Sequence, residues 1–332
     1  LAITGTDVHD LIGKRLVLGG ISTWTNANAG NLGQIRTGNG AVIDNSGSFL
    51  DQTSASTTIN NAFGGGATFI NSGTYTKTGT GTTTAQIVFN NTGTLNGTGL
   101  LVLSAGGTHT GNFAMDEGGT VQLNGGTHSF GGTHTTGSAG RVLLSNGATA
   151  TASGGSMGSA ARWDLEGGTV SGAGSLALNG IANWTGTVFN SGSHTSFGGA
   201  LAISGSDVHD VVGAAVTFAG TTTWTNANAG NLGQIRGVNS TTLTNTGSFV
   251  DATVANTSIN VAYGGGASFT NSGTYQKTGG STVNVSMAFN NLAGGTLQVD
   301  NGTLQLAGGG SGGHGISSKS APARRSGVRR PR

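Results

Sequence analysis

The residues whose types could do chemistry are few and stand in short clusters. Asp7, His9 and Asp10 form the sequence DVHD, which recurs at 207–210. An aspartate and a histidine two residues apart could bind a metal ion, but zinc needs three or four ligands in a fixed geometry. Each copy has a single histidine nearby, so we expect a polar loop and assign no metal site.

A carboxylate pair lies in RWDLEGG at 162–168. Asp164 and Glu166 would share one face of a strand, about 6.5–7 Å apart, and glycosidases use carboxyl pairs about 5–9.5 Å apart. Trp163 and Leu165 would share the opposite face, which is typical of a half-buried strand with a solvated polar face. We therefore assign no catalytic residue here.

Arg36 and Asp51 form a charged set that the chain repeats as Arg236 and Asp251. Pectate-lyase-like enzymes gather several carboxylates and a basic residue on adjacent coils. Asp44 would extend such a set, but the second copy lacks its counterpart. We expect a surface ion pair, which contributes about 0–1 kcal/mol.

Exposed tryptophans can stack on sugar rings. The chain has four, and because only 6% of its residues are aromatic, we expect most of them in the core. Trp184, in NWTGT, is the one that we expect to be exposed. The candidate surface contacts are Trp24, Arg36, Asp51, Trp184, Trp224, Arg236 and Asp251.

The composition indicates an ordered but weakly charged chain. Of 332 residues, 65 are glycine and 8% are charged, against about 25% charged in an average domain. Disordered chains combine high charge with proline, and this chain has two prolines. The absence of cysteine excludes disulfides and thiolate chemistry. Apolar runs fall far short of about 18 residues, so we do not expect the chain to span a membrane.

The net charge of +2 hides an uneven distribution. Six of the 14 basic residues and both prolines lie in 312–332, which we expect to be a disordered basic tail. The remaining body has a net charge near −4 and is not a candidate for nucleic-acid binding.

The chain contains a duplication. Residues 1–90 align with 201–290 at a constant offset of 200, and 52 of the 90 positions are identical. Within the first block Asn45, Asn71 and Asn91 stand in similar phrases, 26 and 20 residues apart. The body divides into roughly twelve units of about 20–27 residues, as in proteins built from stacked repeats.

Each unit contains short runs in which apolar and small polar residues alternate, as half-buried strands do. Glycine and asparagine separate the runs, and no helical period is sustained. Stacked units bury faces that a single unit cannot. We therefore predict an all-β fold, a right-handed parallel β-helix of roughly twelve coils over 1–311. A propeller would need units of about 40–45 residues.

The longest unchanged sequence is TWTNANAGNLGQIR, at 23–36 and 223–236. We interpret it as a turn that sets the register of the coils, because asparagine and glycine tolerate a left-handed backbone. The positions expected to adopt that backbone are Asn26, Asn28, Gly30 and Asn31.

The end of this sequence should form a strand. We expect Leu32 and Ile35 to be buried, and Gln34 and Arg36 to face outward.

The phrases FINSGTYTKTG, FTNSGTYQKTG and FNNTGTLNGTG, with GSLALNG and TWTN, resemble the strand repeats of filamentous-haemagglutinin-like adhesins and autotransporter passengers. The resemblance covers about residues 1–308. It implies an extracellular or cell-surface protein, associated with the outer membrane, for adhesion, self-association or display. The implied partners are glycans or proteins of host or neighbouring cells. We interpret the chain, which starts in mid-repeat, as a fragment or a processed passenger.

We therefore expect a non-catalytic rod without a cofactor. The alternatives are a polysaccharide-active β-helix enzyme and a carbohydrate- or ice-binding module. A lateral groove with three carboxylates, or with a carboxylate–arginine cluster, would favour an enzyme. One flat threonine face would favour an ice binder.

Overall fold

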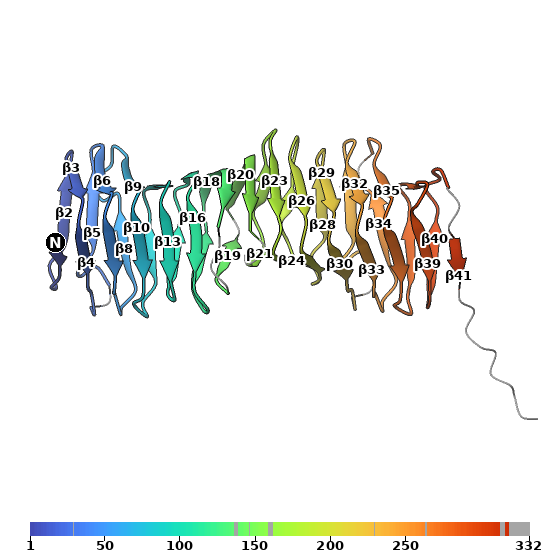
Figure 1. Ribbon diagram of the computed structural model, residues 1–332, viewed down its shortest axis with the longest axis horizontal. Helices are drawn as coiled ribbons and strands as arrows, with labels where there is room; N and C mark the ends of the chain where they lie inside the picture. The colour runs from blue at the N-terminus through green and yellow to red at the C-terminus, as the bar shows by residue number, and fades with distance from the viewer. Residues whose placement is uncertain are drawn as a thin grey trace, which may run out of the picture.

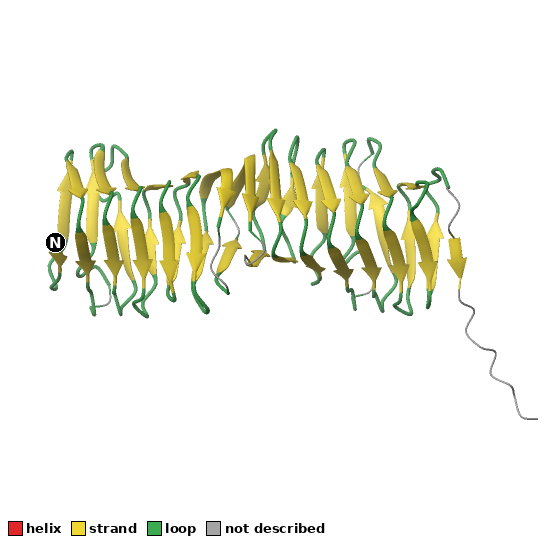
Figure 2. Cartoon of the chain, viewed as in Figure 1, coloured by secondary structure: helices red, strands yellow, loops and turns green. Residues whose placement is uncertain are grey.

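The computed structural model describes residues 1–28, 30–135, 139–145, 147–158, 162–228, 230–262, 264–312 and 316–318. In this part of the chain every regular element is a β-strand, and every strand pairing is parallel. The strands stack into a long rod (Figures 1 and 2), which confirms the predicted parallel β-helix. Apart from 312 and 316–318, the expected basic tail lies outside the described residues.

Each coil contributes one strand to each of three faces, so the first strands pair with the third strand after them. A short sheet, sheet 1, occupies one face of the first half of the rod. Its strands, in order of pairing, are β1 (Ala2–Ile3), β4 (Ile21–Trp24), β7 (Ser48–Asp51), β10 (Thr74–Lys77), β13 (Thr94–Gly97) and β16 (Asn112–Met115).

Sheet 2 runs the whole length of the rod along a second face. Its strands are β2 (His9–Ile12), β5 (Ile35–Gly38), β8 (Thr57–Asn60), β11 (Thr83–Ala85), β14 (Leu100–Leu103), β17 (Thr120–Leu123), β19 (Arg141–Leu144), β21 (Arg162–Leu165), β24 (Ile181–Trp184), β27 (Ala200–Ile203), β30 (Thr221–Trp224), β33 (Ser248–Asp251), β36 (Thr274–Lys277), β39 (Thr296–Val299) and β41 (Ile316–Ser318).

The third face begins as a single series of strands. They are β3 (Arg15–Leu18), β6 (Ala41–Asn45), β9 (Ala67–Asn71), β12 (Val88–Asn91), β15 (Gly107–His109), β18 (Gly126–His134) and β20 (Ala148–Met157).

Strands β18 and β20 form a joint in the middle of the rod. They are 9 and 10 residues long and span two faces, with a shift in their register between Phe130 and Gly132. The N-terminal half of β20 pairs with β22, and its C-terminal half pairs with β23. Two series of strands therefore leave β20, one on each of these two faces.

The first series continues the face of β3. Its members are β22 (Thr169–Ser171), β25 (Val188–Phe189), β28 (His209–Val212), β31 (Ile235–Val238), β34 (Thr257–Val261), β37 (Thr282–Val285) and β40 (Thr303–Leu306).

The second series continues the face of sheet 1, because the backbone N–H of Phe113 in β16 donates to the carbonyl of Thr135, directly after β18. Its members are β23 (Ser175–Leu178), β26 (His194–Phe197), β29 (Ala215–Phe218), β32 (Thr242–Asn245), β35 (Ser268–Asn271) and β38 (Ala288–Asn291).

The two sequence blocks do not occupy the same faces. Strand β30 is the copy of β4, yet β4 lies in sheet 1 and β30 lies in sheet 2. Likewise β28, the copy of β2, lies on the face of β3, and β29, the copy of β3, lies on the face that continues sheet 1. The second block is thus rotated by one face about the rod axis.

Aromatic side chains from successive coils stack inside the rod. The ring centroids of Phe49 and Tyr75 are 5.2 Å apart, and those of Phe69 and Phe89 are 4.8 Å apart. Such pairs stabilise a core beyond the burial of apolar area. The second block repeats both stacks.

Sheet 2 has 15 strands, more than the roughly twelve coils expected. The difference arises because some coils are short. Thr83 pairs with Leu101, 18 residues later, and Arg162 pairs with Ile181, 19 residues later. In the described part of the chain, no helix has the length and apolar character needed to cross a bilayer.

Candidate functional site

The fourteen-residue repeat closes on itself through its side chains. Trp24 Nε1 donates to the carbonyl of Gly33 at 3.2 Å, and Asn26 Nδ2 donates to the carbonyl of Leu32 at 2.8 Å. Asn26 Oδ1 accepts the backbone N–H of Asn28 at 2.8 Å. The same three bonds recur in the second copy. These bonds give a physical reason why the sequence of this turn has not drifted.

The left-handed backbone of the turn falls on its glycines. Gly30 and Gly33 have φ angles of 79° and 63°, whereas Asn26, Asn28 and Asn31 do not have positive φ. The expectation of left-handed asparagines is therefore wrong, although that for Gly30 is confirmed. A Cβ on Gly33 would lie 2.5 Å from Asn26 Cγ, so this position also has no room for a side chain.

The strand that follows the turn differs from the expected pattern. Ile35 is buried as predicted, but Leu32 is 48% exposed and Gln34 only 7% exposed. Leu32 still lies in the turn, so the alternation of a strand does not apply to it. Gln34 bends back into the turn, where its Nε2 donates to the carbonyl of Gly30 at 3.2 Å.

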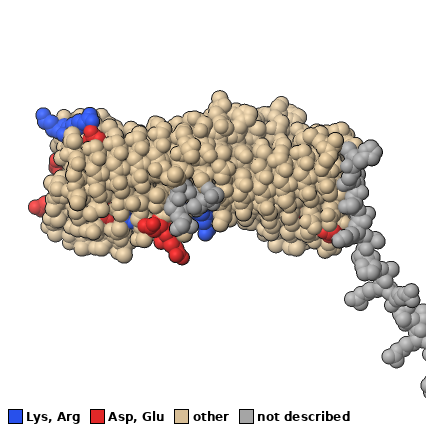
Figure 3. All heavy atoms as spheres, viewed as in Figure 1, with Lys and Arg blue, Asp and Glu red and all other residues tan. Residues whose placement is uncertain are grey.

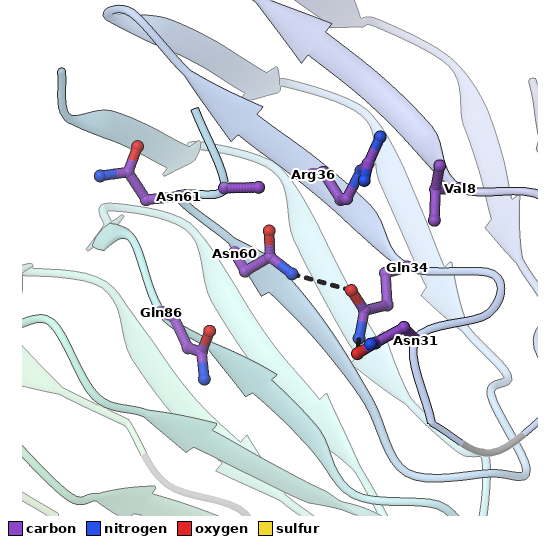
Figure 4. Close-up of a pocket in the computed structure, with 8 residues that line it drawn as sticks. Val8, Asn31, Gln34, Arg36, Asn60, Asn61 and Gln86 are labelled. Carbon is purple, nitrogen blue, oxygen red and sulfur yellow. Dashed lines mark hydrogen bonds between the residues drawn. The ribbon is translucent and has the colours of Figure 1, made fainter. Parts of the chain in front are cut away.

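A polar recess opens where the turn meets β5 and β8, with a volume of about 420 Å³ (Figure 4). Asn60 Nδ2 donates to Gln34 Oε1 at 2.9 Å across its floor, and Gln34 Nε2 donates to Asn31 Oδ1 at 3.3 Å. The residues that line the recess are Val8, Asn31, Gln34, Arg36, Asn60, Asn61, Ala62 and Gln86.

Arg36 supplies the charged group of the recess, and its partner is Asp10. Its Nε and Nη2 donate to the two carboxylate oxygens at 2.7 and 2.6 Å, and its guanidinium carbon lies 5.1 Å from the centre of the Phe63 ring. The hydrogen bonds from Arg36 hold the pKa of the Asp10 carboxyl below its ordinary value. The expected pair of Arg36 with Asp51 is therefore wrong.

The recess combines amides with one neutralised ion pair. Asparagine and glutamine each provide both donors and acceptors, and an arginine on an aromatic ring provides a flat, partly apolar surface. Groups of this kind recognise ligands that carry hydroxyl or amide groups. The described residues contain no cluster of three or more histidine, aspartate or glutamate side chains that could hold a metal ion.

The second block contains the same contacts. Arg236 donates to both oxygens of Asp210 at 2.6 Å, and Asn260 donates to Gln234 Oε1 at 2.8 Å. Two outer residues change, since Asn61 and Gln86 of the first block are replaced by valine and serine. The inner contacts therefore recur in the second block, and two of the outer residues do not. We call the residues Asp210, Gln234, Arg236 and Asn260 the second site.

Asp51 is not a surface contact. Its Oδ1 lies 3.2 Å from Lys77 Nζ, and neither side chain is exposed. Its Oδ2 accepts the hydroxyls of Tyr75 at 2.7 Å and Thr83 at 2.6 Å. Burial lowers the pKa of Lys77, although the negative charge of Asp51 opposes this shift. Burial also raises the pKa of Tyr75 well above its ordinary value.

The same buried pair recurs as Asp251 and Lys277, with 3.5 Å between Oδ1 and Nζ. Asp251 was also expected at the surface, and it too is buried. Strand alternation contained the signal for this pair. In TYTK the lysine stands two residues after the buried tyrosine, so both must point inward.

None of the four tryptophans is exposed. Trp184, expected at the surface, is fully buried, donates from Nε1 to the carbonyl of Thr187 at 2.7 Å and packs edge-on against Phe189. Trp24 and Trp224 are fully buried as well. The remaining candidate contacts are therefore Arg36 and Arg236, which are partly exposed.

The segment RWDLEGG partly follows the expected strand pattern. Trp163 and Leu165 are buried and Glu166 is exposed. Asp164 faces outward but is covered, because Arg141, Arg162 and Asn183 all donate to its carboxylate, at 2.9, 3.1 and 2.6 Å. Its neighbours therefore neutralise the carboxylate of Asp164.

Three buried histidines near the joint were not anticipated. His109 Nε2 lies 3.0 Å from His128 Nδ1, and His134 bonds to the carbonyl of Gly111. Burial lowers the pKa of His128 to about 4 and holds that of His109 well below its ordinary value. The sequence GTHSFGGTH carries the signal, since His128 alternates with the buried Phe130.

Charged side chains are unevenly distributed over the side of the rod seen in Figure 3. They gather near the N-terminal end and around the middle, and most of this side is uncharged. Comparison of the chain with known protein families, curated proteins and solved structures finds no match.

Proposed function

We propose that this chain is a non-catalytic rod of a bacterial surface protein, and that it binds uncharged glycans through the recess and the second site in adhesion to other cells. The observation that carries the proposal is the repeated set of contacts, in which Gln34, Arg36 and Asn60 are bonded as their copies are. The bacterial cell-surface setting rests on the resemblance of the strand repeats to adhesins and passengers.

The charge of the recess favours an uncharged ligand. Arg36 and Asp10 form a bidentate pair, so neither group is free to attract an ion. The exposed amides of Asn31, Asn61 and Gln86 offer donors and acceptors at the rim. Hydroxyl groups of a sugar can take both roles, which matches such a lining.

The positions of the ionisable groups support a binding role rather than a catalytic one. A catalytic acid or base needs a reachable proton site with a tuned pKa. Lys77, Tyr75 and His128 have shifted pKa values, but all three are buried in the core. Their shifts are explained by packing inside the rod.

A polysaccharide-active enzyme is the second candidate. A recess of about 470 Å³ beside the joint is lined by Glu117, Arg141 and Arg162, together with glycines, Thr120 and Ala139. Arg141 and Arg162 with Asp164 form the kind of carboxylate–arginine cluster that would favour an enzyme. The recess itself is lined by a single carboxylate, and Asp164 next to it is saturated by its neighbours. Release of reducing sugar from polysaccharides tests this candidate directly.

The decisive experiment compares glycan binding by the wild type and by a variant in which Asn60→Ala and Asn260→Ala are combined. We expect the wild type to bind neutral glycans in preference to charged ones, and the variant to lose this binding at least tenfold. Asn96→Ala is the matched control, because Asn96 faces outward from β13 on another face. Equal binding by wild type and variant would refute the recess as the site. Sugar release that requires Glu117 would refute the non-catalytic role.

A further inference from the structure

We infer that the rod cross-links two separate glycan surfaces, because the recess and the second site lie on different faces. This inference rests on the proposed function and adds to it a mode of action. A rod with two equal sites on one face would lie flat on a single surface with both sites occupied. A rod whose sites face different sides cannot place both sites on one surface, so it binds two separate surfaces when both sites are occupied.

The strand pairings place the recess and the second site on different faces. The recess lies on β5 and β8, which belong to sheet 2. The second site lies on β31 and β34, which follow β28, β25 and β22 from the N-terminal half of β20. That series continues the face of β3 and β6, which is the neighbour of sheet 2 in every coil.

The face of the recess carries a different surface in the second block. There sheet 2 consists of β30, β33 and β36, which are copies of the sheet 1 strands β4, β7 and β10. Their outward residues include Thr223 and Val250, whereas Arg36 and Asn60 face outward from β5 and β8. The second site therefore does not lie on the face of the recess.

The rotation follows from the number of strands between the copies. Counting β18 and β20 twice because each spans two faces, β2 and β28 are separated by nine coils and one strand. Because this number of strands is not a multiple of three, the copy lies on the next face. Nine coils separate the recess and the second site by about 43 Å at about 4.8 Å per coil, so two large ligands can bind without touching.

Agglutination of coated beads tests the inference. The probes are latex beads coated with mannan, with dextran or with chitin oligosaccharides, all uncharged or nearly so. The full chain is compared with the single variants Asn60→Ala and Asn260→Ala, with the double variant and with Asn96→Ala. We expect the wild type and Asn96→Ala to bind and agglutinate beads of at least one kind. Each single variant should bind about half as much glycan per protein molecule as the wild type and should fail to agglutinate the beads. The double variant should not bind.

The outcomes separate the inference from the proposed function. Binding by the wild type without agglutination, or agglutination by a single variant at the wild-type level, overturns cross-linking while leaving the recess as a binding site. Absence of wild-type binding to all three beads, or undiminished binding by the double variant, overturns the proposed function and with it the inference.

Discussion

Lys77 Nζ lies 3.2 Å from Asp51 Oδ1 in the centre of the rod, and neither side chain reaches solvent. The two residues come from adjacent coils, because Asp51 in β7 pairs with Lys77 in β10. An ion pair of this kind fixes the register between coils, since a slip by two residues would separate the charges and leave both unpaired in the core. The second block repeats the arrangement, so each block has its own buried ion pair that fixes the register of its coils.

Removal of one partner should be far more damaging than removal of both. Lys77→Met leaves the Asp51 carboxylate buried without its cation, and we expect a loss of about 3–5 kcal/mol in the free energy of opening the adjacent coils. The double variant Asp51→Asn/Lys77→Met removes both charges and keeps an amide oxygen for the hydroxyls of Tyr75 and Thr83, so it should lose much less. Hydrogen exchange of β7 and β10 measures the effect locally, which suits a repeat protein whose coils can open separately.

The control for this prediction is Arg15→Met. Arg15 pairs with Asp44 at the surface, where such pairs contribute about 0–1 kcal/mol. A single variant Lys77→Met as stable as Arg15→Met would contradict the proposed role of the buried pair.

A glycine column at one corner of the rod should be intolerant of even one methyl group. A Cβ on Gly73 would lie 2.1 Å from the carbonyl oxygen of Gly47, and a Cβ on Gly93 would lie 2.0 Å from that of Gly73. Because these clashes are with backbone, Gly73→Ala must push the coils apart, and we expect a loss of about 1–3 kcal/mol. Thermal unfolding followed by circular dichroism checks this.

Gly20→Ala is the matched control, because Gly20 stands one coil earlier in the same column, and a Cβ there would contact nothing within 4 Å. Its backbone also lies outside the left-handed region. Equal melting temperatures for the two variants would show that the corner can open without cost.

The fold could be predicted because its signals are local and repeated. The alternation in ATFINSGTYTK is typical of strands with one buried face, and its Phe69 and Tyr75 are both buried. In SFLD, at 48–51, Asp51 stands two residues after the buried Phe49, so alternation places it inside. We expected it at the surface because charged side chains are rarely buried. The deciding information was the partner Lys77, 26 residues away, and a pairing between coils is not visible along one strand.

The faces of the recess and of the second site could not be predicted from sequence. They depend on the number of strands between the copies, and the middle of the chain has irregular units there. Strands β18 and β20 each cover two faces, so a count of apolar runs gives the wrong phase. Likewise Gln34 was expected to face outward because it alternates with Ile35 along the strand. Its hydrogen bonds to Gly30 and Asn31 hold it in the turn instead, and these bonds depend on the three-dimensional shape of the turn.

The repeated turn should depend on a single amide. Asn26→Ala removes the bonds to the Leu32 carbonyl and the Asn28 N–H, and each such loss costs about 0.5–1.5 kcal/mol. We expect faster hydrogen exchange in the turn and weaker glycan binding, because Gln34 and Asn31 line the recess. The copy in the second block should be unaffected in the same molecule, which gives an internal control. Unchanged exchange at the Asn28 N–H would contradict the prediction.

The buried histidines predict that the middle of the rod opens in acid before its ends. Burial lowers the pKa of His128 to about 4, against about 6.5 in an unfolded chain. A base with a lowered folded pKa contributes stability that is complete above about pH 6.5 and decreases as the pH falls toward 4. For His128 the decrease amounts to about 3 kcal/mol at most, and His109, whose pKa is lowered further, acts in the same direction.

Hydrogen exchange at pH 7 and pH 4.5 measures this effect. We expect protection in β15, β18 and β20 to fall at pH 4.5, while β7 and β10 keep theirs. The rings of Phe113 and Phe130 pack on the cluster. The double variant His109→Phe/His128→Phe extends this aromatic packing and should remove most of the pH dependence of the middle strands. An equal loss of protection in the wild type and this variant would assign the acid sensitivity to other groups and refute the role of the histidines.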